Sequence, residues 1–244
     1  MQRIREGSIV SFLYEDKEFI TLKLKEIFPW NASRPLLFDR LFALPKAFFP
    51  LSFPSWETIF PRQQPIYIEY CTGNGHWLCE KALQHPEINW VGVEKQFERV
   101  SKIWSKMKRA QLDNLFIIYG EAELFSHYAP KGAFQQIFMN FPDPWPKRKH
   151  HKHRLIQSSF IQKLSYQLIE GGKFTFVTDD HHYLEWTLRL LLEEGSLRPL
   201  EPFPHYVNEM MGYGSSTFEA LWREKKRTIY YLPCHKPVVE WFHG

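Results

Sequence analysis

Short apolar runs alternate with helix-length segments over most of this chain, and this alternation constrains the fold more than any other feature. The runs occupy residues 66–70, 88–94, 115–120, 136–140 and 173–178. Such a pattern is typical of strands joined by helices in βαβ units. These units form a mostly parallel sheet with helices on both faces, and they place ligand sites at the carboxyl ends of the strands. The sequence therefore predicts an α/β, Rossmann-like fold.

The two ends of the chain differ from this pattern. The run RTIYYLP, at residues 227–233, follows a turn region rich in Gly and Ser and predicts an antiparallel edge strand. Residues 28–65 contain seven prolines interleaved with nine Phe or Trp, which interrupts regular elements but is too apolar for a disordered segment. We expect residues 1–64 to form an irregular extension packed on the core, and residues 65–244 to form the main domain.

Composition excludes several classes of protein. A chain of 244 residues with 44% hydrophobic content can bury a sizeable core, and a formal charge of +4 permits an anionic partner without requiring one. Cys71, Cys79 and Cys234 form no C-x-x-C pair, which favours a reducing compartment and disfavours a thiolate zinc site. The amino-terminal sequence has no apolar signal region, and no run of about eighteen apolar residues follows. We therefore expect a cytoplasmic protein without a membrane segment.

The first strand ends in IEYCTGNGHW, a sequence suited to ligand binding. Glu69 lies at the end of the strand, and Gly73 and Gly75 allow a tight loop into a helix over residues 77–84. The alternative is that this G-x-G is only a strand-to-helix turn. A dinucleotide-binding loop would have a third glycine where this chain has Leu78, so the pattern counts against a dinucleotide.

Acids also follow the second and third strands. Glu94 lies nineteen residues after Gly75, the spacing at which a Rossmann-like fold places an acid that accepts hydrogen bonds from a ribose. The alternative is a solvated acid that pairs with Lys95 or Arg99. Glu121 follows the third strand, where it either contacts the ligand or simply begins a short helix. These acids favour S-adenosylmethionine, which carries a ribose and adenine but no phosphate.

The fourth strand runs into FPDPW, followed by the basic run KRKHHKHR at residues 147–154. Prolines stiffen the corner, Asp143 presents a carboxylate, and Trp145 offers a flat apolar face. The basic run suits the phosphates of an RNA, because eight consecutive residues without an acid repel one another. The alternative is a solvated helix start. A metal site is disfavoured by the interleaved Lys and Arg, although three histidines are candidate ligands: His150, His151 and His153.

These motifs resemble the bacterial tRNA (guanine-N7-)-methyltransferases, whose signature is FPDPW-x-K-[KR]-x-H-x-[KR]-R. The resemblance covers residues 65–232 and includes the glycine loop, a Thr-Asp pair after the fifth strand and a terminal box similar to T-x-F-E. It implies a class I methyltransferase fold, S-adenosylmethionine as cofactor, and methylation of guanine N7 in the variable loop of tRNA.

The resemblance also implies roles for individual residues. Asp143 is the expected catalytic residue. The expected cofactor-binding residues are Glu69, Gly73, Gly75, Glu94, Glu121 and Asp143. The expected contacts to the RNA or the target base are Lys147, Asp179, Ser216, Thr217, Phe218 and Glu219. No metal is expected.

Two departures from the family pattern affect local geometry. Cys71 occupies the position of the first glycine in E-x-G-x-G-x-G, and a side chain there limits φ. The terminal box continues as ALWREKKRTIYY, without the glycine that usually precedes the last strand. Tyr213, Phe218 and Trp222 are further candidates for stacking on bases.

Two other functions compete with this interpretation. A non-catalytic RNA-binding subunit of the same fold would lack an intact cofactor pocket, whereas Glu69, Glu94 and Asp143 are all present. A methyltransferase acting on a protein or small-molecule nitrogen would share the corner, but it would not require the basic run beside it. A methyltransferase acting on another RNA stays an alternative. Both a monomer and a homodimer are compatible with the sequence.

Overall fold

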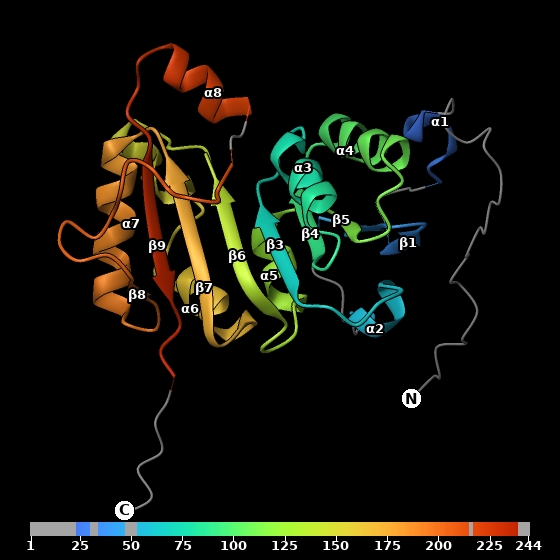
Figure 1. Cartoon of the computed structure of the whole chain (residues 1–244), viewed down its shortest axis with the longest axis horizontal. Coiled ribbons are helices and arrows are strands. Elements are labelled where there is room, and N and C mark those ends of the chain that lie inside the picture. The colour runs from blue at the N-terminus through green and yellow to red at the C-terminus, as the bar shows by residue number, and fades with distance from the viewer. Residues whose placement is uncertain (1–22, 30–33, 47–52, 215–216, 239–244) are drawn as a thin grey trace, which may run out of the picture.

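The computed structural model describes residues 23–29, 34–46, 53–214 and 217–238. Within these residues a nine-stranded sheet has the order β1-β2-β5-β4-β3-β6-β7-β9-β8 (Figure 1). The strands are β1 (Leu36–Phe38), β2 (Leu41–Ala43), β3 (Ile66–Tyr70), β4 (Asn89–Glu94), β5 (Leu115–Tyr119), β6 (Phe134–Asn140), β7 (Leu168–Thr178), β8 (Arg198–Pro199) and β9 (Tyr230–His235).

The sheet is mostly parallel, as the sequence predicted. Strands β2, β5, β4, β3, β6 and β7 pair in parallel, whereas β1 and the pair β9 and β8 are antiparallel to their neighbours. β9 therefore confirms the predicted antiparallel strand, and the two-residue β8 lies outside it. Each parallel strand ends at the same edge of the sheet, which is where the candidate site residues were expected.

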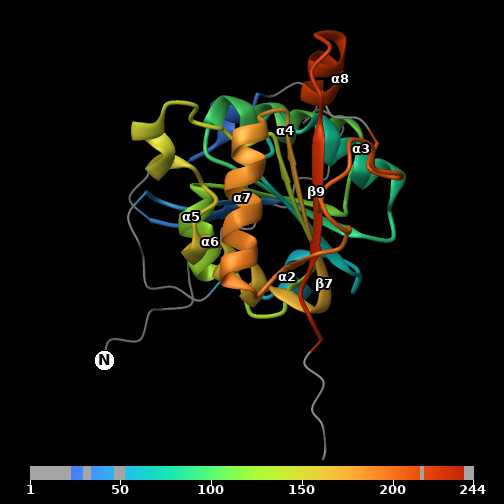
Figure 2. The same ribbon diagram turned by 90° about the vertical axis from the view of Figure 1, so that its left-hand side faces the viewer.

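Helices cover both faces of the sheet (Figures 1 and 2). One face packs against α2, α5, α6 and α7, and the other against α1, α3 and α4. The helices are α1 (Leu24–Ile27), α2 (Trp56–Ile59), α3 (His76–Gln84), α4 (Phe97–Arg109), α5 (Ala122–Tyr128), the 3-10 helix η2 (Arg148–His153), α6 (Ser158–Gln167), α7 (His181–Glu194) and α8 (Thr217–Glu224).

Strict alternation along the strands divides the apolar side chains between two cores. In β5, Phe116 and Ile118 face one core while Leu115 and Ile117 face the other. Successive side chains of a strand point to opposite faces, so a strand covered on both sides must be apolar throughout. All six residues of β4 are buried for this reason.

The helices follow equally simple rules. α4 buries Val100, Ile103, Trp104 and Met107, an i, i+3, i+4, i+7 stripe that faces the sheet. α7 is capped by the preceding residue Asp180, whose Oδ1 accepts a hydrogen bond from the backbone N–H of Tyr183 at 2.8 Å. Among the described residues, no helix combines the length and the apolar character needed to cross a bilayer.

The stretch before residue 65 contributes regular structure that no sequence pattern indicated. The β1–β2 hairpin extends the sheet, because β2 pairs in parallel with β5. Trp56 and Phe60 are buried, and both contact Phe116. The division of the chain at residue 65 stays a prediction.

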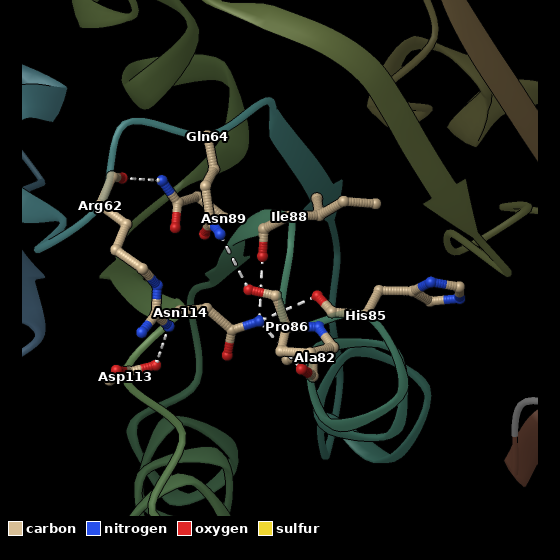
Figure 3. A network of polar contacts seen from close by, with 9 residues as sticks. All are labelled: Arg62, Gln64, Ala82, His85, Pro86, Ile88, Asn89, Asp113 and Asn114. Atoms are coloured by element: carbon tan, nitrogen blue, oxygen red, sulfur yellow. Dashed lines mark hydrogen bonds and ion pairs between the residues drawn. The ribbon is translucent and has the colours of Figure 1, made fainter.

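A polar network joins the loops at the amino ends of the strands, opposite the candidate site (Figure 3). Nδ2 of Asn114 donates to the carbonyl oxygens of Ala82, His85 and Ile88 at 2.9–3.1 Å, which satisfies carbonyl groups at and just beyond the end of α3. Nδ2 of Asn89 donates to the carbonyl oxygen of Arg62 at 2.8 Å. The amide donors of Asn89 and Asn114 therefore find partners here and hold together the loops at this end of the sheet.

Candidate active site

A cavity of about 500 Å³ lies at the carboxyl ends of the central strands. Its wall is formed by the loops that follow β3, β4, β5 and β6, as expected for a parallel sheet with helical crossovers. All six residues expected to bind the cofactor line it: Glu69, Gly73, Gly75, Glu94, Glu121 and Asp143.

The loop between β3 and α3 turns through three residues of positive φ. These are Cys71 (61°), Gly73 (61°) and Gly75 (69°). At Gly75 a Cβ atom would lie 2.6 Å from Cγ1 of Ile103, so only glycine fits. Cys71 adopts the left-handed conformation that its glycine counterpart in the family pattern would adopt freely, which costs a residue with a side chain on the order of 1–2 kcal/mol. The chain therefore keeps the loop geometry at the expense of local strain.

Glu94 holds this loop against the end of β4. The carboxylate is 4% exposed and accepts hydrogen bonds from the backbone N–H groups of Gly73 at 2.8 Å, and of Lys95 and Gln96 at 2.9 Å. Arg99 lies 3.8 Å away as an ion-pair partner. Glu94 is thus no solvated acid, although the expected pairing with Arg99 is present. Its carboxylate organises the cavity wall before any ligand binds.

Glu69 is the most unusual acid of the site. It is 2% exposed, and its Oε1 accepts a hydrogen bond from Nδ2 of Asn140 at 2.7 Å. Within the described residues its Oε2 has no hydrogen-bond partner, and neither has Oδ1 of Asn140. Burial raises the pKa of Glu69 to about 8, and the nearby Glu94 adds to this effect. Two unpaired buried oxygens at the cavity wall form a site for a hydrogen-bond donor or a cation.

Glu121 lies at the more open side of the cavity. It is the residue before α5, and its carbonyl oxygen accepts the N–H of Phe125 at 2.9 Å. Its carboxylate forms an ion pair with Nζ of Lys95 at 3.4 Å, and both side chains are about half exposed. The residue therefore starts a helix and also contributes a carboxylate to the cavity.

The FPDPW corner has a strained backbone. Phe141 and Trp145 have φ values of 50° and 43°, a region that residues with side chains rarely adopt. Asp143 is exposed, and its Oδ1 accepts a hydrogen bond from the N–H of Trp145 at 3.1 Å. The ring of Trp145 contacts those of His150 and His153, at centroid distances of 5.8 and 5.2 Å. The corner thus presents the Asp143 carboxylate beside an aromatic cluster.

The basic run after the corner folds as η2, which has no buried residue. Lys147, Arg148, Lys149 and Lys152 are exposed, in keeping with a surface that neutralises phosphates. Arg154, the last member of the run, is only 2% exposed. The run therefore does not act as a single exposed surface.

Two of the remaining expected substrate contacts, Asp179 and Glu219, are described, and neither lines the cavity. Asp179 forms an ion pair with Arg227, which follows α8. Glu219 is 4% exposed and accepts hydrogen bonds from Nε of Arg223 at 2.9 Å and the hydroxyl of Tyr231 at 2.7 Å. Ser216 lies outside the described residues, as do the side chains of Thr217 and Phe218, although Thr217 begins α8. Their substrate roles stay predictions.

The two described aromatic candidates for base stacking already have partners. Tyr213 is 3% exposed and stacks on Trp77 at a centroid distance of 5.3 Å. Nζ of Lys225 and the guanidinium of Arg227 lie 4.8 and 4.2 Å from the ring centroid of Trp222. Tyr213 is thus a core residue in this conformation, and the Trp222 ring holds neighbouring cations together.

Asn140 and Leu221 also line the cavity, and sequence reasoning missed both. Asn140 had a detectable signal, because it is a polar residue at the tip of an otherwise buried strand, directly before FPDPW. Leu221 had none, because α8 lies far along the chain and reaches the carboxyl ends of the strands only in three dimensions (Figures 1 and 2).

Comparison with known proteins adds evidence independent of this geometry. A family model described as "Putative methyltransferase" matches residues 63–232. The tRNA (guanine-N(7)-)-methyltransferase of Chlamydia muridarum is 44% identical over 212 residues, covering 85% of this chain and 93% of that protein. The enzyme of the same name from Chlamydia trachomatis serovar D is 42% identical over 211 residues, with the same coverage of both chains.

Solved structures agree at the level of fold. The crystal structure of 16S rRNA methyltransferase KamB superposes with a TM-score of 0.53 at 17% identity, and the match covers 75% of this chain and 92% of that one. The aminoglycoside resistance methyltransferase NpmB1 superposes with a TM-score of 0.52 at 13% identity, covering 72% and 89%. The sheet and its helices are therefore arranged as in class I methyltransferases.

Proposed function

Because the chain belongs to the tRNA (guanine-N(7)-)-methyltransferase family, we propose that it transfers a methyl group from S-adenosylmethionine to N7 of a guanine in the variable loop of tRNA. The observation that carries the proposal is the position of the FPDPW corner. Asp143 and Trp145 share one cavity with three acids and a glycine loop, so a methyl donor and an acceptor base can meet there.

The residues around the cavity fit S-adenosylmethionine, which supplies an activated methyl group on a sulfonium. This molecule carries a ribose diol and two positive charges but no phosphate. Glu94 offers acceptor oxygens for the diol from a preformed position. Glu69 and Asn140 offer the two unpaired buried oxygens described above, which suit the cationic amino acid portion. Glu121 adds a third carboxylate at the open side.

Asp143 acts by orientation and charge. Guanine N7 carries a lone pair and no proton, so methylation at this atom needs no general base. The base gains positive charge as the methyl group is transferred, and a carboxylate held nearby stabilises that charge. The exposed Asp143 lies at the cavity wall, where it can hold the guanine edge in line with the methyl donor.

The exposed part of the basic run brings the RNA to this corner. The cations of η2 begin three residues after Trp145, so phosphates bound there lie next to the cavity. Phosphate contacts position the RNA without reading its sequence. The choice of guanine then depends on the corner and on the fold of the tRNA.

The test is incubation of the protein with S-adenosylmethionine carrying a labelled methyl group and with tRNA, followed by aniline cleavage at N7-methylguanosine. We expect label in the tRNA and a single cleavage site in the variable loop. A matched tRNA with adenosine at that site should take up no label. Label without cleavage would mean methylation of a different atom, and no label would refute the proposal.

A further inference from the structure

Arg154 is the last residue of the basic run, and it differs from the rest of the run. It is 2% exposed, whereas its basic neighbours Lys149 and Lys152 are exposed. A guanidinium is always charged, and taking it out of water is costly without partners. No described carboxylate forms an ion pair with Arg154. The buried guanidinium must therefore be stabilised by contacts other than an ion pair.

These contacts come from the corner on one side and from α7 on the other. Nε of Arg154 donates a hydrogen bond to the carbonyl oxygen of Pro144 at 2.8 Å. The guanidinium lies over the rings of Tyr183 and Trp186 in α7, at 4.8 and 5.3 Å from their centroids. Such cation–π contacts are strongest when the cation is shielded from water. Arg154 thus bridges α7 and the residue that follows Asp143.

The same two rings also hold the chain that follows Arg154. The hydroxyl of Tyr183 accepts the N–H of Ile156 at 3.3 Å, and Nε1 of Trp186 donates to the carbonyl oxygen of Ile156 at 2.9 Å. Nε2 of Gln157 donates to the carbonyl oxygen of Arg154 at 3.1 Å. The segment that carries Arg154 is therefore fixed to α7, so its contact with Pro144 transmits that position to the corner.

The corner needs such a support. Phe141 and Trp145 hold strained positive φ values, and a strained backbone persists only when its surroundings enforce it. Among the residues that the structure describes, the one side-chain hydrogen bond of Asp143 is to Trp145, inside the same corner. The N–H of Phe141 donates to the carbonyl oxygen of Val177 in β7 at 2.8 Å, which ties the start of the corner to the sheet. The contact of Arg154 with Pro144 relates the later residues of the corner to α7.

We propose that Arg154 is a positioning residue that fixes the FPDPW corner, and with it Asp143, against α7, and is not part of the surface that docks the RNA. This assignment rests on the proposed function in one respect, which is that methyl transfer is the reaction in which Asp143 takes part. Lysine cannot replace Arg154, because an ammonium lacks the planar group that stacks on two rings while it donates to a carbonyl.

The experiment compares Arg154→Lys with Arg148→Lys and Arg148→Ala, which alter an exposed arginine of the same run. We measure the single-turnover rate of methyl transfer at saturating S-adenosylmethionine and tRNA, and the salt dependence of tRNA binding. Arg154→Lys should lower the rate by about tenfold or more and leave the salt slope unchanged. Arg148→Ala should shallow the slope by about one unit, whereas Arg148→Lys keeps the charge and should leave the slope unchanged.

Hydrogen exchange of the backbone provides a second readout that needs no activity. Arg154→Lys should raise the exchange rate at the four non-proline residues of 141–147, while exchange in β3 and β4 stays as in the wild type, which also shows that the variant is folded. Trp186→Leu, which removes one of the two rings and leaves Arg154 intact, should raise exchange in the same residues.

These outcomes separate the two proposals. If the wild-type protein methylates no tRNA, the proposed function fails, and the exchange data still decide the role of Arg154. Unchanged exchange at residues 141–147 in both variants would overturn the positioning role. A wild-type rate in Arg154→Lys, together with a salt slope shallower by about one unit in Arg154→Ala, would instead make Arg154 a docking residue.

Discussion

Glu69 shows how a single buried residue prepares a site for a charged ligand. Its environment favours the protonated acid, since burial is the main cause of the raised pKa and Glu94 adds to it. A bound cation beside Oε2 would favour the carboxylate instead. An ionised Glu69 therefore lowers the stability of the protein at high pH, and Oε2 is the oxygen to which a ligand could donate.

Replacement of Glu69 by Gln should flatten the pH dependence of stability. The pKa is about 8 in the folded protein and near its ordinary value of 4.5 in the unfolded chain. The folded state thus binds the additional proton between these values, so the free energy of unfolding falls as pH rises through this window. Glu69→Gln removes this contribution, which is on the order of a few kcal/mol.

Urea unfolding of the ligand-free protein at several pH values between 5 and 8.5 measures this effect. All other titrating groups are common to both proteins, so the difference between the two profiles isolates Glu69. Parallel profiles would show that Glu69 does not hold its proton in the folded state.

Asp143 is the residue on which the chemistry depends most. Asp143→Ala should lower the single-turnover rate by about a hundredfold or more, because the transition state loses a charge that opposes the developing cation. Affinity for tRNA should stay near that of the wild type. Asp143→Asn keeps an acceptor oxygen for the N–H of Trp145, so it separates the loss of charge from the loss of corner geometry. Equal rates in all three proteins would make Asp143 a structural residue.

At the scale of elements, one short helix carries most of the exposed charge beside the site. η2 follows a stiff, proline-rich corner and ends at the buried Arg154. Both ends of the helix are therefore anchored while its cations face water. In this arrangement the exposed cations of the basic run form the proposed docking surface, and Arg154 supports the FPDPW corner.

Neutralising two cations of η2 should weaken the salt dependence of tRNA binding. The double variant Lys149→Ala and Lys152→Ala should shallow the slope of log K against log salt by about one to two units, because fewer counterions are released. Affinity for S-adenosylmethionine should not change. The matched control replaces Lys131 and Lys173, which are exposed and lie away from the candidate site, and should leave the slope unchanged. Equal slopes in both double variants would remove η2 from the docking surface.

At the scale of the whole molecule, α8 is held from both halves of the sheet. Before it, Nε1 of Trp77 in α3 donates to the carbonyl oxygen of Tyr213 at 2.9 Å, across 136 positions of sequence. After it, Arg227 forms an ion pair with Asp179 at the end of β7. The position of α8 relative to the cavity therefore depends on contacts with distant parts of the fold.

The amino-terminal part of the chain is integral to that fold. Leu41, Leu44, Trp56 and Phe60 are each less than 10% exposed and pack on the sheet or its helices. A chain that begins at residue 61 should lose at least about 5 kcal/mol of stability, since loss of one buried Trp or Phe side chain alone costs about 3–5 kcal/mol. Urea unfolding measures this, with a chain that begins at residue 23 as the control. Equal unfolding midpoints would mean that residues 61–244 fold independently of these contacts.

Local sequence determined the elements and much of the cavity. β3 occupies the predicted residues 66–70, because its apolar run and flanking turn residues define the strand without distant contacts. Glu69, Glu94, Glu121 and Asp143 were found by the simple rule that parallel strands end at one edge of a sheet. The sequence alone thus predicted which acidic side chains lie at that edge of the sheet.

Tertiary structure alone decided which of these residues face water and which face each other. Nothing local distinguishes Arg154 from the arginine at 148, yet the rings of Tyr183 and Trp186 bury one and leave the other exposed. The pairing of β2 with β5 and the contact of Leu221 with the cavity likewise join distant segments. Burial and ion pairing arise from contacts between residues far apart in the chain, so the local periodicity of the sequence does not predict them.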